Sequence, residues 1–370
     1  MFIKLSKKGI KLIKYSLFKI MYGEIKKIIR PQSDKNIILN KAILENSKSY
    51  NCYNISNGRI FSDTVNNTAY ILKDCLIKDV SYQFKLKKNL QIINGNTSDN
   101  FVIKNGTPKI LKKINGTVFS LLSGGAAKNN YWHWIFDVLP KLAILEKSKF
   151  KNKPDYYLLP SLYKKYQIET LSMLKIPLNK LLNGEIYKHI ICDNLLAVDH
   201  PNVFNNNPSK SIINIPHWII KWLRKKYIKK NNSSSKKYER IYINREKDSI
   251  LDNRKIINNQ DVKEILNKFG FKIITVSDYS FNDQVKIFSN AKFIVGLHGA
   301  AFANLVFSKQ KTKIIELASK HSGNIFANLA KNCKLDYRKI VDNKSQSKHQ
   351  NNPIMVDLKK LKKLIYPSIK

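Results

Sequence analysis

Apolar and polar positions follow two alternating patterns through the second half of the chain. Short β-branched runs predict buried strands, and apolar residues at helical spacing between them predict helices. The expected strands are 240–245, 271–276, 293–295 and 314–315, and the expected helices are 259–269, 282–290, 300–307 and 324–333. This alternation is typical of an α/β protein with a doubly wound parallel sheet.

The first third of the chain has a different pattern. Short alternating segments between residues 31 and 122 are broken by Asn-Gly pairs at 57–58, 94–95, 105–106 and 115–116. Such spacing predicts hairpins or the edge of a mixed sheet. Beyond them, expected strands at 156–159 and 189–191 flank an expected helix at 166–174, which restores a βαβ order.

The domain organisation follows from these patterns and from one polar run. Residues 231–237, NNSSSKK, are typical of a linker. We therefore expect a basic leader at 1–30, an N-terminal α/β domain at 31–230, a C-terminal Rossmann-like domain at 231–350 and a closing helix within 351–370.

The leader is strongly basic, with nine basic residues and one acid in positions 1–30. Its aliphatic residues recur at helical spacing, with lysines such as Lys8, Lys11 and Lys19 on the far side; they are Ile10, Ile13, Leu17, Ile20 and Met21. Two interpretations fit this pattern equally. The helix lies on an anionic membrane surface, or it is a solvated helix that packs on its own domain.

Composition narrows the class of protein. A hydrophobic fraction of 43% with 11% aromatic residues is typical of a folded globular chain. The net charge of +41 would attract nucleotides, anionic membranes and nucleic acid alike. The lysines are scattered, however, and the chain has no RNA-recognition motif or zinc finger. We expect no specific nucleic-acid partner, and a basic nucleic-acid-binding protein is the alternative from another class.

Location can be predicted from the cysteines and the apolar runs. The four cysteines lie far apart without CxxC spacing, which indicates a reducing compartment and no structural zinc. No apolar run approaches the roughly 18 residues of a membrane span, and lysines interrupt the start of the chain where a secretory signal would be apolar. We expect a cytoplasmic protein, peripheral on the inner membrane face if the leader binds lipid.

The stretch 291–318 contains the clearest candidate chemistry. A strand ends at the turn Gly296-Leu297-His298-Gly299, a helix starts at Ala300, and a second strand ends on Glu316. Because ligands of parallel sheets bind at the carboxyl ends of strands, the helix N-terminus and His298 would bind a phosphate, and Glu316 would bind a ribose. This predicts a nucleotide or nucleotide-sugar site; the alternative is a buried sheet with a histidine satisfied in the core.

Three further residues are candidates for the same site. Arg245 lies at the end of the first strand of this domain and Arg254 in the loop after it, where guanidinium groups would neutralise a diphosphate. Gln284, at the start of the next helix but one, is placed to contact a base or the donor sugar. Surface ion pairs for the arginines, and a structural role for Gln284, are the competing interpretations.

A second constellation lies in the N-terminal half. Asn130 is a candidate N-cap of a helix that runs from Trp132 to Leu145 and contains Pro140, so a kink or a short break is expected. His133 and Asp137 are four positions apart and share one helix face. Either His133 is a general base held by Asp137, or Asp137 is the base and His133 orients it, or the two only anchor the helix.

Several motifs are missing from the sequence. It has no Walker GxxxxGK[ST] motif, no GxGxxG after a strand and no DxD pair. We therefore expect neither a metal nor another cofactor, with basic side chains and a helix terminus stabilising the diphosphate instead.

Taken together, these residues resemble glycosyltransferase family 61. The resemblance spans roughly residues 120–320 and depends on four stretches, which are NYWHWIFDVLPKL (130–142), RIYINREKD with the following Arg and Asn (240–258), FNDQ (281–284) and VGLHGAAFANLVF with IIEL (295–317). The resemblance implies a GT-B fold, with two Rossmann-like domains facing a cleft, and an inverting, metal-independent transfer from a nucleotide sugar.

The resemblance also implies roles for individual residues. Arg245, His298 with the Gly299-Ala300 turn, and Glu316 would hold the donor, while Asp137 or His133 would face the acceptor. The family uses several donors and acceptors, so the resemblance identifies neither. Together with the basic leader, these residues lead us to expect a glycan or a lipid-linked precursor of a surface polysaccharide such as capsule or lipopolysaccharide as the acceptor. An inactive, transferase-like scaffold that binds the donor without transfer is a further alternative.

Overall fold

The computed structural model describes residues 7–45, 49–86, 92–94, 96–151, 153–202, 213–228, 238–246, 254–342 and 351–368. The chain divides into two compact units, Met1–Ile212 and Ile213–Lys370. The helix α7 (His217–Tyr227) packs in the second unit against the 3₁₀ helix η8 (Ala300–Phe307). The division therefore lies earlier than position 230, because the apolar face of α7 belongs to the core of the second unit. The expected linker 231–237 lies outside the described residues.

The first unit contains a sheet of twelve strands within the described residues. The strands are β1 (Lys27–Ile29), β2 (Ile37–Ile43), β3 (Ser49–Ser56), β4 (Arg59–Ser62), β5 (Asn67–Leu72), β6 (Cys75–Ile77), β7 (Tyr82–Leu86), β8 (Ile92–Asn94), β9 (Lys112–Ser120), β10 (Tyr156–Leu159), β11 (Leu181–Asn183) and β12 (His189–Val198).

Strand β12 divides this sheet into a parallel half and a half that is antiparallel except for β1, which pairs in parallel with β6. On one side it pairs in parallel with β9, followed by β10 and β11. On the other side it pairs antiparallel with β4 through its first residues and with β3 through its last. The sheet is therefore mixed, and the expectation that the first domain repeats the Rossmann-like pattern holds only for its parallel half. The hairpins expected between residues 31 and 122 form the other half.

The Asn-Gly pairs of this unit have different structural roles. Asn57 and Gly58 form the turn between β3 and β4, with Asn57 at a φ of 50°. Gly106 ends the helix α2 (Phe101–Asn105). The pair at 115–116 is a β-bulge inside β9, where the register with β12 shifts and the amide of Gly116 donates to Asp193 at 2.6 Å. Gly95 lies outside the described residues. Because β3 and β4 both pair antiparallel with β12 and not with each other, Asn57-Gly58 is no hairpin turn but a link between two successive strands. A dipeptide with the same turn propensity thus serves as a strand link, a helix end or a bulge, depending on its strand partners.

The remaining helical segments of the first unit are α1 (Lys7–Tyr22), η1 (Pro31–Ser33), η3 (Thr97–Asp99), η4 (Gly125–Lys128), α3 (Tyr131–His133), η5 (Trp134–Val138), α4 (Pro140–Lys147), α5 (Lys165–Met173) and η6 (Leu178–Lys180). None of the helices in the described part of the chain is long and apolar enough to cross a membrane.

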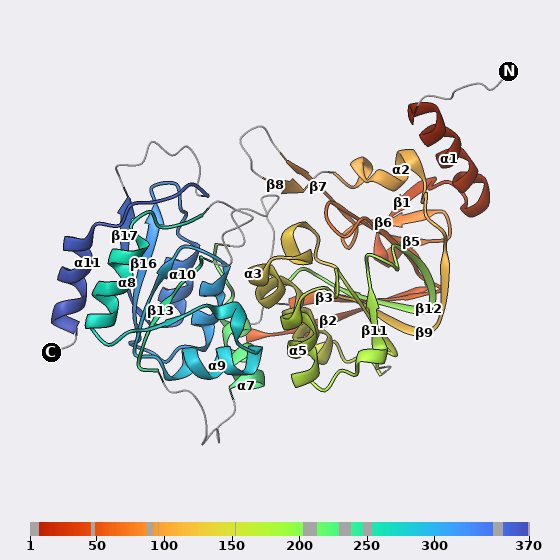
Figure 1. Ribbon diagram of the computed structural model, residues 1–370. Coiled ribbons are helices and arrows are strands. Elements are labelled where there is room, and N and C mark those ends of the chain that lie inside the picture. Colours follow the sequence, from red (N-terminus) through yellow and green to blue (C-terminus); the bar gives the residue numbers. More distant parts are fainter. Residues whose placement is uncertain are drawn as a thin grey trace. The chain divides into compact units, whose positions relative to one another are not determined.

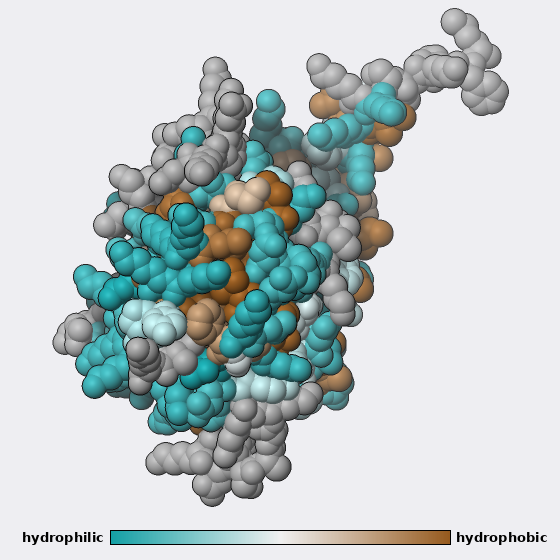
Figure 2. Space-filling model, turned by 60° about the vertical axis from the view of Figure 1, so that its left-hand side comes forward, coloured by the Kyte–Doolittle hydropathy of each residue, from teal (hydrophilic) through white to brown (hydrophobic). Residues whose placement is uncertain are grey.

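The helix α1 packs on its own unit through one face. The ring of Tyr22 lies 5.2 Å from that of His189 in an edge contact, and Arg59 donates to the Tyr22 carbonyl at 2.9 Å. Its aliphatic side chains remain exposed, and they are seen in brown beside hydrophilic side chains at the upper right of Figure 2. Packing on its own domain, one of the two interpretations of the leader, therefore holds for the described residues, and the other face stays available.

The segment α3–η5–α4 is one helical rod with a π-helical turn in the middle. Asn130 caps it as expected, because its side chain accepts from the amide of Trp132 at 2.9 Å. The amide of Leu139 donates to the carbonyl of Trp134, five positions back, at 3.0 Å. Pro140 follows directly; it has no N–H group and its ring conflicts with the preceding turn, so the rod widens there instead of breaking.

The second unit is a five-stranded parallel sheet covered by helices (Figure 1). Its strands are β13 (Arg240–Ile243), β14 (Lys272–Ile274), β15 (Phe293–Leu297), β16 (Lys313–Ser319) and β17 (Asp336–Asp342). Its other helices are α8 (Asn259–Lys268), η7 (Val276–Asp278), α9 (Phe281–Asn290), α10 (Ile325–Asn332), α11 (Leu358–Ile365) and η9 (Tyr366–Ser368).

The strand order β14-β13-β15-β16-β17 confirms the doubly wound sheet expected for this unit. The chain leaves β13 toward one edge and then returns to build the other side, so right-handed crossovers place α8 on one face and α9, η8 and α10 on the opposite face. The closing helix α11 joins α8, and its Leu361 lies in one core with Tyr242 and Val295. The carboxyl ends of β13 and β15 adjoin where the winding direction reverses, which is where such sheets bind ligands.

Candidate active site

His298 lies at the carboxyl end of β15, as expected from the sequence. Its amide donates to the carbonyl of Leu317 at 2.9 Å, and its ring packs against Phe326 with centroids 4.7 Å apart. Ring atom Nδ1 forms a very short hydrogen bond with a carboxylate oxygen of Glu316. Within the part of the chain that the structure describes, Nε2 has no hydrogen-bonding partner, so this atom is the polar group that the ring offers to a ligand.

Two arginines converge on the backbone beside His298. Arg245, which follows β13, and Arg254, from the segment before α8, both donate through Nη1 to the carbonyl oxygen of His298, at 3.1 and 3.0 Å. The second guanidinium also bonds to the side-chain oxygen of Asn351. The guanidinium groups of Arg245 and Arg254, which are 9 positions apart in sequence, are thus held together at the carboxyl ends of the strands.

Gly299 makes the approach of Arg245 sterically feasible. A Cβ atom at this position would lie 2.3 Å from Nη1 of Arg245, a distance that no real Cβ contact shows. The glycine expected to admit a phosphate therefore admits a guanidinium. The helix that begins at Ala300 is a 3₁₀ helix, and its first internal bond runs from the amide of Phe302 to the carbonyl of Gly299. The amides of Ala300 and Ala301 precede that bond and point from the same turn.

Glu316 lies inside its strand rather than at the end. β16 continues to Ser319, and Glu316 pairs in register with Gly296 of β15. The side chain is fully buried, with one oxygen bonded to His298 and the other to the hydroxyl of Tyr337 through very short contacts. The expectation that an acid ends this strand is wrong, because the apolar run resumes with Leu317 and Ala318. Both carboxylate oxygens are engaged within the protein, so the geometry favours a positioning role over direct contact with a ribose.

Gln284 is likewise occupied by structural contacts. Its amide nitrogen donates to the carbonyls of Val276 and Tyr279, at 3.1 and 3.0 Å, and its oxygen accepts from Asn304 at 3.1 Å. The side chain is buried in the first turn of α9. These bonds fix the loop before α9 to η8, which corresponds to the structural interpretation of this residue.

Sequence reasoning missed two residues of this cluster. Tyr337, the second residue of β17, is the second partner of Glu316. Burial first, and then the Glu316 charge, raises the pKa of its hydroxyl well above the ordinary value. Asn351 lies more than 90 positions from its partner Arg254. Strand register alone could have suggested Tyr337, since β17 adjoins β16, but no local pattern marks Asn351.

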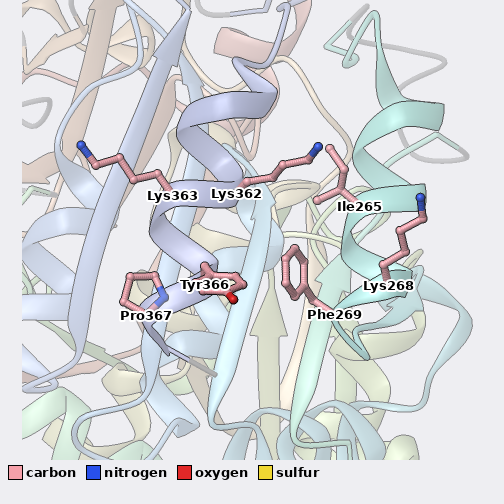
Figure 3. Close-up of a pocket in the computed structure, with 7 residues that line it drawn as sticks. All are labelled: Ile265, Lys268, Phe269, Lys362, Lys363, Tyr366 and Pro367. Atoms are coloured by element: carbon pink, nitrogen blue, oxygen red, sulfur yellow. The ribbon is translucent and has the colours of Figure 1, made fainter. Parts of the chain in front are cut away.

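Two cavities of the second unit differ in size and place. The space beside Arg245, Asn244 and Glu246 measures about 10 Å³, room for a single water; Arg254 and His298 do not line it. A larger cavity of about 640 Å³ lies between α8 and α11, where Phe269 and Tyr366 face each other (Figure 3). Because Phe269 directly precedes the β14 segment, this cavity is at the amino ends of the strands, away from His298.

In the first unit, His133 and Asp137 form a hydrogen-bonded pair. Nδ1 of His133 lies 2.6 Å from Oδ2 of Asp137, and Oδ1 of the same carboxylate accepts from the amide of Asn202 at 2.7 Å. The carboxylate is nearly inaccessible, whereas the histidine side chain keeps a fifth of its surface exposed. No hydrogen bond to Nε2 of His133 occurs among residues placed in the structure. The histidine is therefore the member of the pair that a substrate can reach.

The electrostatics of Asp137 agree with this assignment. Burial by itself would raise the pKa of this carboxyl, but the charge and hydrogen bond of His133, with contributions from His200 and Asn202, lower it overall. Asp137 is thus ionised at neutral pH and can hold the Nδ1–H tautomer of His133, which leaves Nε2 as a proton acceptor. The carboxylate itself is a weak base, because its lone pairs already accept two hydrogen bonds.

Two basic groups near this pair were not expected from the sequence. Lys141 lies four positions beyond Asp137, so the three residues follow one stripe of the helical rod, and burial lowers the pKa of Lys141 to about 8. Its ammonium donates to the carbonyl of Leu122 at 2.5 Å. Burial also lowers the pKa of His200 to about 4, so this ring is neutral. The spacing 133/137/141 could have revealed Lys141, whereas His200 comes from the distant end of β12.

A search of the curated proteins finds no match to this chain. The family model described as Glycosyltransferase 61 matches residues 131–315, which is half of the chain and includes both His133 with Asp137 and the Arg245–His298 cluster. The resemblance seen in the sequence is confirmed, and the chain belongs to glycosyltransferase family 61.

Proposed function

We propose that this glycosyltransferase moves a hexosyl or pentosyl group, with inversion, from a nucleotide-sugar donor to a glycan or lipid-linked acceptor during synthesis of a surface polysaccharide such as capsule or lipopolysaccharide. The observation that carries the proposal is the meeting of Arg245 and Arg254 at the His298 carbonyl, at the switch point of a doubly wound sheet.

The donor diphosphate would be held by these two arginines. Guanidinium groups stay ionised and offer several N–H donors in a planar fork, so they bind phosphate oxygens in pairs. The amides at Ala300 and Ala301 supply further donors on the same turn, and His298 adds an Nε2–H donor in its imidazolium form, in which Nδ1–H still bonds Glu316. Glu316 would act on the donor indirectly, by fixing the ring of His298 through Nδ1.

The acceptor would be activated by His133. Nε2 of His133 takes the proton of an acceptor hydroxyl, and the oxygen attacks the anomeric carbon of the donor. The bond between that carbon and the phosphate oxygen breaks, and its electron pair leaves with the nucleoside diphosphate, so the configuration is inverted. Asp137 is a positioning residue that stabilises the imidazolium formed in this step.

Neutralisation of the leaving diphosphate by arginines makes a divalent ion unnecessary in this scheme. Full activity in the presence of EDTA is therefore expected. We further propose a cytoplasmic location, which the four free thiols of Cys52, Cys75, Cys192 and Cys333 support.

A thermal-shift panel of UDP-, GDP-, CMP- and dTDP-sugars in EDTA tests the donor half. A ligand at one hundred times its dissociation constant stabilises the folded protein by about 2.7 kcal/mol, which such a panel detects. Arg245→Ala should abolish the shift. Arg240→Ala is the matched control, because Arg240 begins the same strand and donates to the carbonyl of Phe269 at 3.0 Å, at the opposite end of the sheet.

The outcomes separate the competing functions. A thermal shift that is lost in Arg245→Ala and retained in Arg240→Ala supports a donor site at the carboxyl ends of the strands. Equal shifts in both variants would place the donor elsewhere. A donor that binds but releases no free nucleoside diphosphate with any glycan or lipid-linked acceptor would indicate an inactive scaffold.

A further inference from the structure

The helix α1 has two apolar faces, and only one of them is used by the fold. The aromatic face packs on the first unit: Tyr15 meets the ring of Phe101 at 5.9 Å, and the hydroxyl of Tyr22 accepts from the amide of Leu111 at 3.2 Å. These contacts fix the orientation of the helix. The opposite face therefore points in a defined direction rather than turning freely.

That opposite face is a stripe of aliphatic side chains. At 100° per residue, its members fall within about 100° of the helix circumference. They are between 47% and 81% exposed, and they are Ile10, Ile13, Leu17, Ile20 and Met21. Leu12 is also exposed but lies outside the stripe. A contiguous exposed aliphatic stripe on a well-anchored helix indicates a surface that is covered when the protein functions.

A basic cavity adjoins the stripe. Lys14 lies next to Met21 on the helix circumference, and beyond it α1 borders a cavity of about 420 Å³. Three more lysines line this cavity, which are Lys109, Lys112 and Lys188. Its rim contains two further exposed aliphatic residues, Ile110 and Ile186, which are 72% and 58% exposed.

The charges inside the cavity leave it positive overall. Its acid, Glu185, is engaged by Lys128 at 2.8 Å and by Lys188 at 3.6 Å. Burial lowers the pKa of His189 to about 4, so that ring is neutral. Lys112 lies 4.6 Å from the ring centre of Tyr187, which orients its ammonium, and Lys109 is exposed. Phosphate is the anion that such a group of lysines would bind, with aliphatic side chains on either side of it.

We propose that the aliphatic stripe of α1 and the adjoining lysine cavity form a docking surface for an anionic phospholipid bilayer. The stripe inserts among the acyl chains at the headgroup boundary, and the lysines bind lipid phosphates. A second copy of the chain would present the same positive cavity, and the net charge of +41 opposes such pairing. The surface thus combines two signals, apolar insertion and positive charge, that stable membrane attachment requires.

Vesicle flotation of the full chain tests the apolar half of this surface. The protein should float with vesicles of phosphatidylcholine mixed with phosphatidylglycerol and remain unbound with phosphatidylcholine alone. Leu17→Glu should lower the partition coefficient about tenfold or more, because a buried leucine contact is lost. Leu12→Glu is the matched control, since it places the same charge on the same helix at similar exposure but outside the stripe, and its binding should stay within about twofold of wild type.

Charge reversal tests the basic half. Lys109→Glu with Lys112→Glu should lower the partition coefficient about tenfold or more. Lys359→Glu with Lys360→Glu, on the exposed side of α11, loses the same net charge in the other unit and should bind nearly as well as wild type. Equal losses in the two double variants would overturn the proposal, because they would show attraction by overall charge alone.

Other results would also overturn it. Binding to neutral vesicles, no binding to anionic ones, or equal effects of the Leu12 and Leu17 variants would exclude this surface. So would a wild-type dimer in sedimentation equilibrium that Leu17→Glu converts to a monomer. The assay involves no turnover, so its failure would remove the docking surface and leave the proposed transfer reaction untouched.

Discussion

Nδ1 of His133 lies 2.6 Å from Oδ2 of Asp137 across one turn of a helical rod. The turn between them is π-helical, and Pro140 directly follows it. Widened turns of this kind are frequent at functional sites. The pair is fixed from outside the helix as well, because Asn202 donates to the second oxygen of Asp137.

Substitutions of the pair decide which member is the base. Both Asp137→Asn and His133→Gln should lower kcat on the order of 10²–10⁴-fold and leave KM little changed, because the loss falls on proton transfer. Steady-state kinetics over a range of pH measures this. If His133→Gln keeps its activity while Asp137→Asn does not, Asp137 is the base. Near-normal kcat in both variants would contradict the proposed mechanism.

Gly299→Ala should weaken donor binding without touching the donor. The added Cβ lies too close to the Arg245 guanidinium, which must leave the His298 carbonyl. We expect the dissociation constant of the donor to rise about tenfold or more, as for loss of one charged hydrogen bond. Calorimetry measures the constant.

Gly323→Ala is the control for that substitution, because nothing lies within 4 Å of a Cβ built there. It should bind the donor like wild type. The double variant Gly299→Ala with Arg245→Ala should bind no worse than Arg245→Ala alone, since both act on one guanidinium. Fully additive losses would show that Gly299 acts independently of Arg245.

Glu316 should contribute strongly to stability. Glu316→Gln removes a fully buried carboxylate that bonds both His298 and Tyr337, so the free energy of unfolding should fall by about 1–3 kcal/mol for each hydrogen bond that is lost. Tyr337→Phe removes one donor and should cost about 1–3 kcal/mol. Tyr163→Phe, at an exposed tyrosine, should change nothing. Urea unfolding followed by tryptophan fluorescence gives these values; a stable Glu316→Gln variant would show that the carboxylate is dispensable for folding.

Lys141 should make stability depend on pH. Its pKa is near 10.5 in an unfolded chain and about 8 in the folded protein, because burial disfavours the charge. Between these values the unfolded chain binds more protons, so the Lys141 contribution to the free energy of unfolding rises with pH. The cost of burying the cation is therefore greatest below pH 8.

Lys141→Met removes this contribution. The variant should be more stable than wild type at pH 7, by up to about 3 kcal/mol less the lost hydrogen bond to Leu122, and the advantage should shrink toward pH 10.5. Urea unfolding of both proteins across pH 7–10 measures the difference in their free energies of unfolding. All other titratable groups are present in both proteins, so the pH dependence of this difference reports Lys141 alone. A constant difference would show that Lys141 titrates normally.

Local patterns in the sequence determined much of this protein. The alternation of β-branched runs and helical spacing predicted four of the five parallel strands of the second unit, because buried parallel strands are apolar on both faces. The fifth, β17, alternates charged and apolar residues and was not predicted. The N-cap at Asn130, the irregularity at Pro140 and the adjacency of His133 and Asp137 also follow from spacing within a few residues. The family could be recognised from the same stretches, since its motifs are local.

Contacts between distant segments were decided only by the tertiary structure. Strand register, not sequence position, buried Glu316 between His298 and Tyr337. Packing of α9 beside η8 placed Gln284 in hydrogen bonds with the loop before α9 and with Asn304. Packing of α1 determined which of its two apolar faces remained exposed. A single sequence specifies which side chains are polar, but whether a polar group meets a ligand or a protein partner depends on which remote segment packs beside it.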